Sequence, residues 1–164
     1  MIWYFAYGSN MNRARLEERL AAERVGMGAR VGGRLDGWRL GFNKVRRGTP
    51  ASGAANIVRA AGGVVHGTLN EMPEEGLAVL DRFEGVTTRQ YRREIVPVVR
   101  ADTGAPVNAT TYVALNVGSD TLLPLREYLA HLLAGRDLLP ANYCALLDAQ
   151  RVADDESRDG KLKR

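Results

Sequence analysis

The stretch Tyr4-Phe5-Ala6-Tyr7-Gly8-Ser9-Asn10-Met11 marks the point where a run of bulky residues ends and a charged helical pattern begins. Residues 2 to 7 are Ile, Trp, Tyr, Phe, Ala and Tyr, which favours a strand buried on both faces. Gly8 permits a sharp turn, and Ser9 or Asn10 can cap the helix that follows. A strand leading into a capped helix leaves free backbone N–H groups that favour an anion. The pattern therefore predicts a strand–loop–helix unit whose loop is either an ordinary turn or an anion site.

The size and composition of the chain fit one soluble domain. It has 164 residues, of which 45% are hydrophobic and 26% charged, and its apolar runs are too short to span a bilayer. The apolar N-terminus has neither a basic n-region nor a small-residue cleavage site, so we expect no signal peptide. The single cysteine, Cys144, excludes an internal disulfide and favours a reducing, cytoplasmic location. Its apolar helical surroundings predict a packing role.

Neither the charge nor the histidines indicate a nucleic-acid or metal site. The net charge is +4, but basic residues are scattered among acids instead of forming a stripe with exposed aromatics. His66 and His131 lie far apart, and neither belongs to a metal-ligand spacing. We expect no nucleic-acid partner, no membrane association and no bound metal.

The hydrophobic spacing predicts four helices. Leu16 and Leu20 mark the buried side of a helix over Asn12 to Ala22. Proline followed by two glutamates begins a second helix, from about Pro73 to Glu84. Two short helices are predicted near the end of the chain, over Pro124 to Leu133, with Gly135 as its C-cap, and over Pro140 to Ala149.

The intervening segments predict strands and hairpins, and hence an α+β fold. The expected segments are a connector with a short strand over Gly26 to Gly33, a strand over Leu35 to Phe42, a loop over Asn43 to Gly53, a hairpin of Ala54 to Arg59 with Val64 to Leu69, and a hairpin of Tyr91 to Val99 with Val107 to Leu115. Lys44, Arg46 and Arg47 in the loop either meet an acidic substrate or are simply solvated. We expect residues 1–150 to form one domain and the charged residues 151–164 a flexible tail.

Glu84 is the candidate for acid–base chemistry. Counting seven residues from Leu77 and four from Leu80 places it on the buried side of the second helix, and Gly85 places it in the last turn. Burial and the negative end of the helix dipole both raise a carboxyl pKa, which suits a general base near neutrality. In the alternative, the helix ends one residue earlier and Glu84 faces solvent or pairs with Arg82 or Arg89.

Tyrosine hydroxyls are a second clue. Tyr91, Tyr112 and Tyr128 lie in elements that should face the core, although a buried tyrosine often needs only one hydrogen-bond partner. A nucleophilic role for Ser9 is not supported, because no histidine is suitably placed and the Gly-x-Ser-x-Gly motif is absent.

These residues carry a family resemblance. The stretch from Tyr4 to Met11, together with Asp81-Arg82-Phe83-Glu84-Gly85-Val86 followed by Tyr91, resembles the γ-glutamylcyclotransferases of the AIG2-like superfamily. The resemblance spans nearly the whole chain and takes in Gly53-Ala54-Ala55-Asn56-Ile57, Val65-His66-Gly67, and Leu139-Pro140 with Tyr143.

The resemblance implies a small, mixed, partly closed β-barrel with helices outside, often a homodimer. By matching position, the loop of Tyr7, Gly8, Ser9 and Asn10 resembles the substrate-binding loop, and Glu84 the catalytic acid/base. Tyr91 is similar to a pocket tyrosine, and Tyr112 and Tyr128 less securely so. The implied reaction needs no cofactor: the α-amine of a γ-glutamyl amide attacks its own γ-carbonyl, which forms 5-oxoproline and releases an amine or amino acid.

The sequence leaves two alternatives open. The same fold acts on γ-glutamylamines or on a γ-glutamyl-protected metabolite, or it is a non-catalytic module that binds a small molecule or a protein. The acid at position 84 argues against the second. The leaving group and the role of the loop Asn43 to Gly53 are not determined by the sequence.

Overall fold

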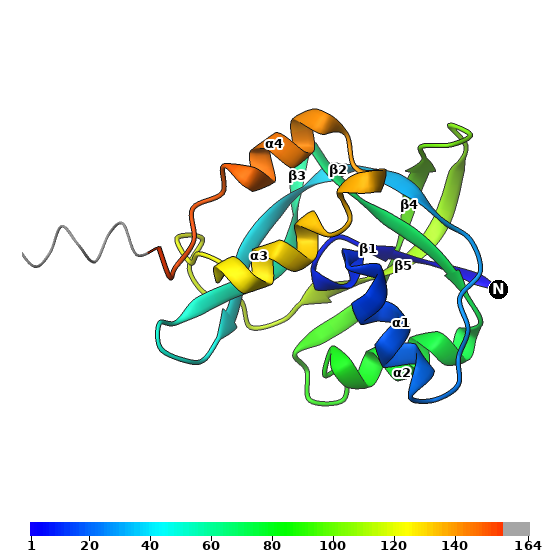
Figure 1. Cartoon of the computed structure of the whole chain (residues 1–164), viewed down its shortest axis with the longest axis horizontal. Coiled ribbons are helices and arrows are strands. Elements are labelled where there is room, and N and C mark those ends of the chain that lie inside the picture. The colour runs from blue at the N-terminus through cyan, green and yellow to red at the C-terminus, as the bar shows by residue number, and fades with distance from the viewer. Residues whose placement is uncertain (156–164) are drawn as a thin grey trace, which may run out of the picture.

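A computed structural model describes residues 1–155, and at its centre five strands form a closed barrel (Figure 1). The strands are β1 (Ile2–Ala6), β2 (Arg30–Arg46), β3 (Ser52–Met72), β4 (Tyr91–Arg100) and β5 (Pro106–Ala114), in the order β1-β3-β2-β4-β5. The pairing of β1 with β5 is parallel, and the other neighbouring strands are antiparallel. The predicted α+β class and small mixed barrel are confirmed.

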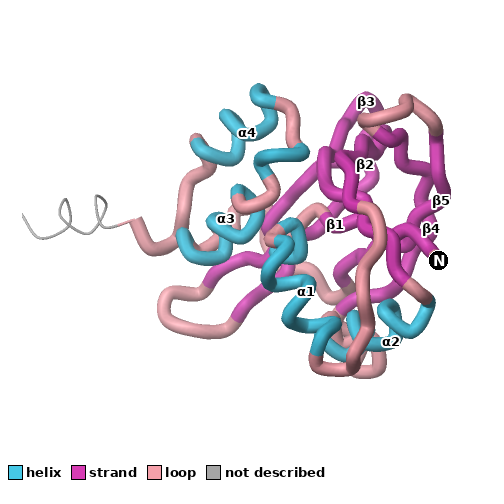
Figure 2. The backbone as a smooth tube through the Cα atoms, turned by 45° about the vertical axis from the view of Figure 1, so that its right-hand side comes forward, coloured by secondary structure: helices cyan, strands magenta, loops and turns pink. Residues whose placement is uncertain are grey.

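The helices lie outside the barrel, as Figure 2 shows. They are the 3₁₀ turn η1 (Ser9–Met11), α1 (Arg13–Ala21), α2 (Glu74–Phe83), α3 (Arg126–Leu133), the 3₁₀ turn η2 (Arg136–Leu138) and α4 (Ala141–Asp148). Helices α1 and α2 lie together at one end of the barrel, and α3 and α4 form a separate pair on its flank. No helix among residues 1–155 is both long and apolar enough to cross a membrane.

The strand–loop–helix unit at the N-terminus is present, but its cap differs from the expectation. Leu16 and Leu20 are fully buried, as predicted for α1. The capping residue is Asn12, whose side-chain oxygen accepts from the backbone N–H of Arg15 at 3.3 Å. Ser9 and Asn10 do not cap α1, because both belong to the short η1 turn that precedes it.

The middle of the chain corrects several predictions. Strand β2 is continuous from Arg30 to Arg46, so the expected connector strand, strand and loop form one element, and the turn is limited to residues 47–51. The expected hairpin over residues 54–69 is wrong, because β3 is a single strand paired with β2. The register shifts twice, between Asp36 and Trp38 and between Gly41 and Lys44. Such bulges interrupt the alternation of side chains, which made each half-strand resemble a separate element.

The remaining elements mostly agree with the predictions. Helix α2, the β4–β5 hairpin and the two C-terminal helices lie within about two residues of the expected bounds. Gly135 does not cap α3, whose C-cap is Ala134; it is the N-cap residue of η2 instead. Cys144 is partly buried and packs against the core, as expected.

The start of the predicted tail is docked on the fold. Val152 is buried, the N–H of Ala153 donates to the carbonyl of Pro124 at 2.9 Å, and the Asp154 carboxylate accepts from the N–H of Arg126 at 2.9 Å. These contacts correct the expectation of a flexible segment for residues 152–154. The rest of the predicted tail, residues 156–164, lies outside the described residues.

Candidate active site

A cavity of about 310 Å³ opens where the loop after β1, the end of α2 and the paired strands β2 and β3 meet. It brings together every site residue proposed from the sequence: the loop of Tyr7, Gly8, Ser9 and Asn10, the carboxyl group of Glu84, and the three tyrosines Tyr91, Tyr112 and Tyr128. These residues come from β1, η1, α2, β4, β5 and α3 and their connections. The fold therefore gathers residues that lie up to 121 positions apart in the chain.

The loop after β1 lies tightly against the opposite wall of the cavity. A Cβ atom added to Gly8 would lie 3.2 Å from the Cβ of Ala55 and 3.3 Å from the hydroxyl oxygen of Tyr128. Glycine at this position therefore permits the close approach. Ser9 and Asn10 follow as the first residues of η1, where N–H groups have no acceptor within the turn itself. These groups suit a carboxylate or an oxyanion.

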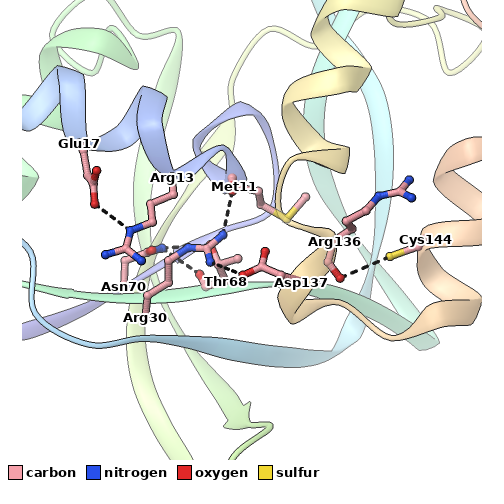
Figure 3. Close-up of polar contacts among 9 residues, drawn as sticks. All are labelled: Met11, Arg13, Glu17, Arg30, Thr68, Asn70, Arg136, Asp137 and Cys144. Carbon is pink, nitrogen blue, oxygen red and sulfur yellow. Dashed lines mark hydrogen bonds and ion pairs between the residues drawn. The ribbon is translucent and has the colours of Figure 1, made fainter.

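The end of the loop is anchored from outside the cavity (Figure 3). The guanidinium of Arg30 donates to the carbonyl of Met11 at 3.1 Å and to the Asp137 carboxylate at 3.0 Å. The Arg30 side chain is 8% exposed but that of Asp137 is 62% exposed, so the bond to the Met11 carbonyl is better shielded from solvent than the ion pair. Arg30 thus holds η1 to β2 and η2, and fixes where the loop residues lie.

Glu84 follows α2 as its C-cap, and its backbone N–H donates to the carbonyl of Leu80 at 2.8 Å. Burial raises the pKa of its carboxyl group to about 6, while the nearby positive charges of Arg19 and Arg15 oppose that rise. Helix α2 does end one residue before Glu84, as the alternative supposed, but the pairing of Glu84 with Arg82 is wrong, because Arg82 pairs with Glu23 at 3.3 Å. Within residues 1–155 the Glu84 side chain forms no ion pair within 4.0 Å. This is a carboxyl group that can gain and lose a proton close to neutral pH.

Two of the tyrosines, Tyr91 and Tyr128, form hydrogen bonds with the backbone of one residue in the cavity wall, Ala55. The hydroxyl of Tyr91 donates to the carbonyl of Ala55 at 3.1 Å, and the hydroxyl of Tyr128 accepts from the N–H of Ala55 at 2.9 Å. Burial raises the pKa of both hydroxyls, that of Tyr128 to about 12, so both stay protonated at neutral pH. The Tyr128 hydroxyl keeps its own proton for a further acceptor in the cavity.

The hydroxyls of Tyr7 and Tyr112 are used within the protein. Tyr7 donates to the backbone carbonyl of Tyr112. Tyr112 donates to the Asp81 carboxylate at 2.7 Å and approaches the carbonyl of Leu77 at 3.3 Å. Tyr7 and Tyr112 line the cavity, but their hydroxyls join the loop after β1 to β5 and join β5 to α2.

The structure adds residues that the sequence analysis did not assign to the site. The Asn10 side chain donates to the hydroxyl of Tyr4 at 3.0 Å and accepts from the guanidinium of Arg19 at 3.0 Å. Arg15 and Arg19 are one helical turn apart on α1, so their side chains lie on the same face of the helix, and both line the cavity. Lys44 and Arg46 also line the cavity. Both were predicted to lie in a loop, but they belong to strand β2.

The residues described by the structure include no cluster of three or more His, Cys, Asp or Glu side chains that could hold a metal ion. His66 packs its ring against Tyr143, with centroids 5.0 Å apart. His131 lies 3.0 Å from the side-chain nitrogen of Asn12. The two histidines therefore have structural neighbours at separate places in the fold.

The closed five-stranded barrel with its outer helices has structural counterparts among γ-glutamyl cyclotransferases. One solved γ-glutamyl cyclotransferase superposes with a TM-score of 0.81 at 24% identity, over 99% of this chain and 98% of that one. A human protein described as uncharacterized has a TM-score of 0.78 at 25% identity, over 99% and 98% of the two chains. A yeast γ-glutamyl cyclotransferase specific to glutathione has a TM-score of 0.59 at 14% identity, over 89% and 93%.

Residues 64–147 match the sequence model of the AIG2-like family, and the chain belongs to that family. A comparison with curated proteins found no match. At 24% and 14% identity, the two cyclotransferase structures establish that the fold is shared, and they do not by themselves establish a shared reaction.

Proposed function

We propose that the protein is a γ-glutamyl cyclotransferase, which converts a γ-glutamyl amide into 5-oxoproline and a free amine or amino acid. The observation that carries this proposal is the position of Glu84. A carboxyl group with a pKa of about 6 lies in the same cavity as the loop of Gly8, Ser9 and Asn10. Burying an unpaired acid lowers stability, which is a cost that a purely binding module has no need to carry. Membership of the AIG2-like family and the shared fold support the proposal.

The first task of the site is to fold the substrate. A γ-glutamyl chain is flexible, and cyclisation requires its α-nitrogen to meet its γ-carbonyl carbon. Holding reacting groups in this geometry raises effective molarity to as much as about 10⁵ to 10⁸ M. Backbone N–H groups of Ser9 and Asn10 are suited to the α-carboxylate or to the oxyanion that develops on the γ-carbonyl. A Cβ atom added at Gly8 would lie 3.3 Å from the Tyr128 hydroxyl oxygen. This hydroxyl is therefore close enough to the loop to donate a hydrogen bond to a group bound there.

The second task is proton transfer. The substrate's α-ammonium group is not nucleophilic until it loses a proton, which the Glu84 carboxylate accepts. The amine then attacks the γ-carbonyl, and Glu84 returns its proton to the departing nitrogen as the amide C–N bond breaks. The new lactam nitrogen gives up its second proton to Glu84, which passes it to the released amine. The reaction consumes neither water nor a redox partner, so a single carboxyl group balances the protons.

The test is the rate of 5-oxoproline release from a panel of γ-glutamyl compounds, measured by mass spectrometry with the wild type and with Glu84→Gln. We expect the substitution to lower turnover by about 10²- to 10⁴-fold, the usual contribution of a positioned acid/base. The matched control is Glu18→Gln, which changes an exposed glutamate on α1. Near wild-type turnover by Glu84→Gln, or no lactam from any γ-glutamyl compound with the wild type, would refute the proposal.

We also propose a cytoplasmic location, from the single cysteine, and a homodimer, from the family resemblance. Light scattering coupled to size-exclusion chromatography tests the second point. A mass equal to one 18.0 kDa chain would contradict it.

A further inference from the structure

The cavity contains more positive charge than the proposed reaction requires. Its lining includes four cationic side chains, Arg15, Arg19, Lys44 and Arg46, and one carboxylate, Glu84. Arg15 and Arg19 are close enough to influence the pKa of Glu84. Lys44 and Arg46 are not among the groups that influence it, and they come from a different wall of the cavity, the end of strand β2.

Lys44 and Arg46 form a pair along that wall. Residues two apart on a strand point to the same face, so both side chains project together. The ammonium of Lys44 lies 5.8 Å from the ring centre of Tyr91, and the guanidinium of Arg46 lies 5.2 Å from the ring centre of Tyr128. Both rings belong to the tyrosines that hold Ala55. The pair therefore lies over the cavity's aromatic wall.

Neither cation has an anionic partner among the residues that the structure describes. Lys44 is only 8% exposed, and its ammonium donates to two neutral oxygens, the Gln90 side chain at 2.8 Å and the carbonyl of Leu115 at 3.3 Å. An ammonium has three donors, so one remains for another acceptor. Within residues 1–155, neither Lys44 nor Arg46 forms an ion pair with a carboxylate. A cation held this way is poised to bind an anion that enters the cavity.

The charges of the substrate's two halves show which half this anion belongs to. The γ-glutamyl half has one carboxylate and one ammonium, which the loop after β1 and Glu84 can receive. An alkylamine leaving group would bring no negative charge to the remaining cations. A monocarboxylic amino acid brings one carboxylate, and an acidic amino acid brings two, which matches the two cations, Lys44 and Arg46, that β2 contributes to the cavity.

We propose that Lys44 and Arg46 form a subsite for the carboxylates of the leaving group, so that γ-glutamyl dipeptides with an acidic second residue are preferred substrates. This inference rests on the proposed cyclotransferase reaction and concerns the half of the substrate that leaves. It assigns a role to the basic segment that the sequence analysis left undetermined.

The experiment compares kcat/KM for γ-glutamyl-glutamate, γ-glutamyl-alanine and γ-glutamyl-ethylamide in the wild type, Arg46→Gln and Lys44→Gln. The wild type should prefer them in that order. Because a hydrogen bond to a charged group contributes about tenfold to a hundredfold in binding, each variant should lower the glutamate-to-ethylamide ratio by about tenfold or more. The ratio is the readout, because a general loss of folding or activity cancels from it.

The matched control is Arg47→Gln, which removes the same charge from an exposed arginine that does not line the cavity. It should leave the ratio at the wild-type value. Arg46 is itself exposed, so its variant tests the proposal even where Lys44→Gln does not fold.

The outcomes separate this inference from the proposed function. Two results would overturn the subsite while the cyclotransferase proposal stands. One is a wild-type kcat/KM for γ-glutamyl-ethylamide that equals or exceeds that for γ-glutamyl-glutamate, and the other is a glutamate-to-ethylamide ratio that does not change in Arg46→Gln. Absence of lactam from all three compounds in the wild type would overturn both.

Discussion

Replacing Glu84 with glutamine should make the protein more stable at neutral pH, even though it removes most activity. In the folded protein the pKa of Glu84 is raised from 4.5 to about 6. One pKa unit corresponds to about 1.4 kcal/mol, so the ionised carboxylate lowers folding stability by about 2 kcal/mol. Glutamine keeps the size of the side chain and removes the buried charge.

The sign of the effect depends on pH in a defined window. Above about pH 6, Glu84 is ionised in both the folded and the unfolded protein, and the full cost is present. As the pH falls from about 6 to 4.5, the folded state takes up the proton first, and the cost disappears. The stabilisation by Glu84→Gln should therefore be about 2 kcal/mol at pH 7.5 and close to zero at about pH 4.

Thermal and urea unfolding of the two proteins at both pH values measures this difference. For a chain of this size, about 2 kcal/mol corresponds to a rise in Tm of about 4–8 °C at pH 7.5. Other carboxylates titrate in the same range, but they cancel in the comparison of variant with wild type. Glu18→Gln, at an exposed position, should change stability by less than about 0.5 kcal/mol. A Glu84→Gln variant that is no more stable than the wild type at pH 7.5 would refute the view that the cost of burying the Glu84 charge exceeds its attraction to Arg15 and Arg19.

The contacts around the site lead to three further predictions. The acid limb of the kcat/KM profile should lie near the Glu84 pKa of about 6. In the wild type the charge of Arg19 lowers this pKa, so Arg19→Gln should move the acid limb to higher pH. The pH–rate profiles of both proteins check this. Tyr112→Phe should lower the free energy of unfolding by about 1–3 kcal/mol, because it removes a hydrogen bond to the Asp81 carboxylate, and an unchanged urea midpoint would contradict this. Asn12→Ala should lower it by about 1 kcal/mol through loss of the α1 cap, whereas Ser9→Ala should have no capping effect; urea unfolding of both variants distinguishes the two.

Local features of the sequence were sufficient where side-chain spacing alone fixes the element. Leu16 and Leu20 predicted α1, and the proline and glutamates before Leu77 predicted α2, because a helix is stabilised by contacts three or four residues apart. The β4–β5 hairpin was predicted by two β-branched runs around a turn. The long β2–β3 pairing was not, because its bulges change the alternation in a way that only the partner strand defines.

Sequence alone established that Glu84 lies at the end of an amphipathic helix and that a glycine loop follows the first strand. Motif resemblance then gathered the tyrosines into one proposed site. The packing of distant elements settled which of their groups remain available, since the hydroxyls of Tyr7 and Tyr112 are used within the protein and that of Tyr128 faces the loop. It also brought Lys44 into the cavity, because burial and charge pairing depend on residues far away in the chain, whereas propensity and periodicity are local.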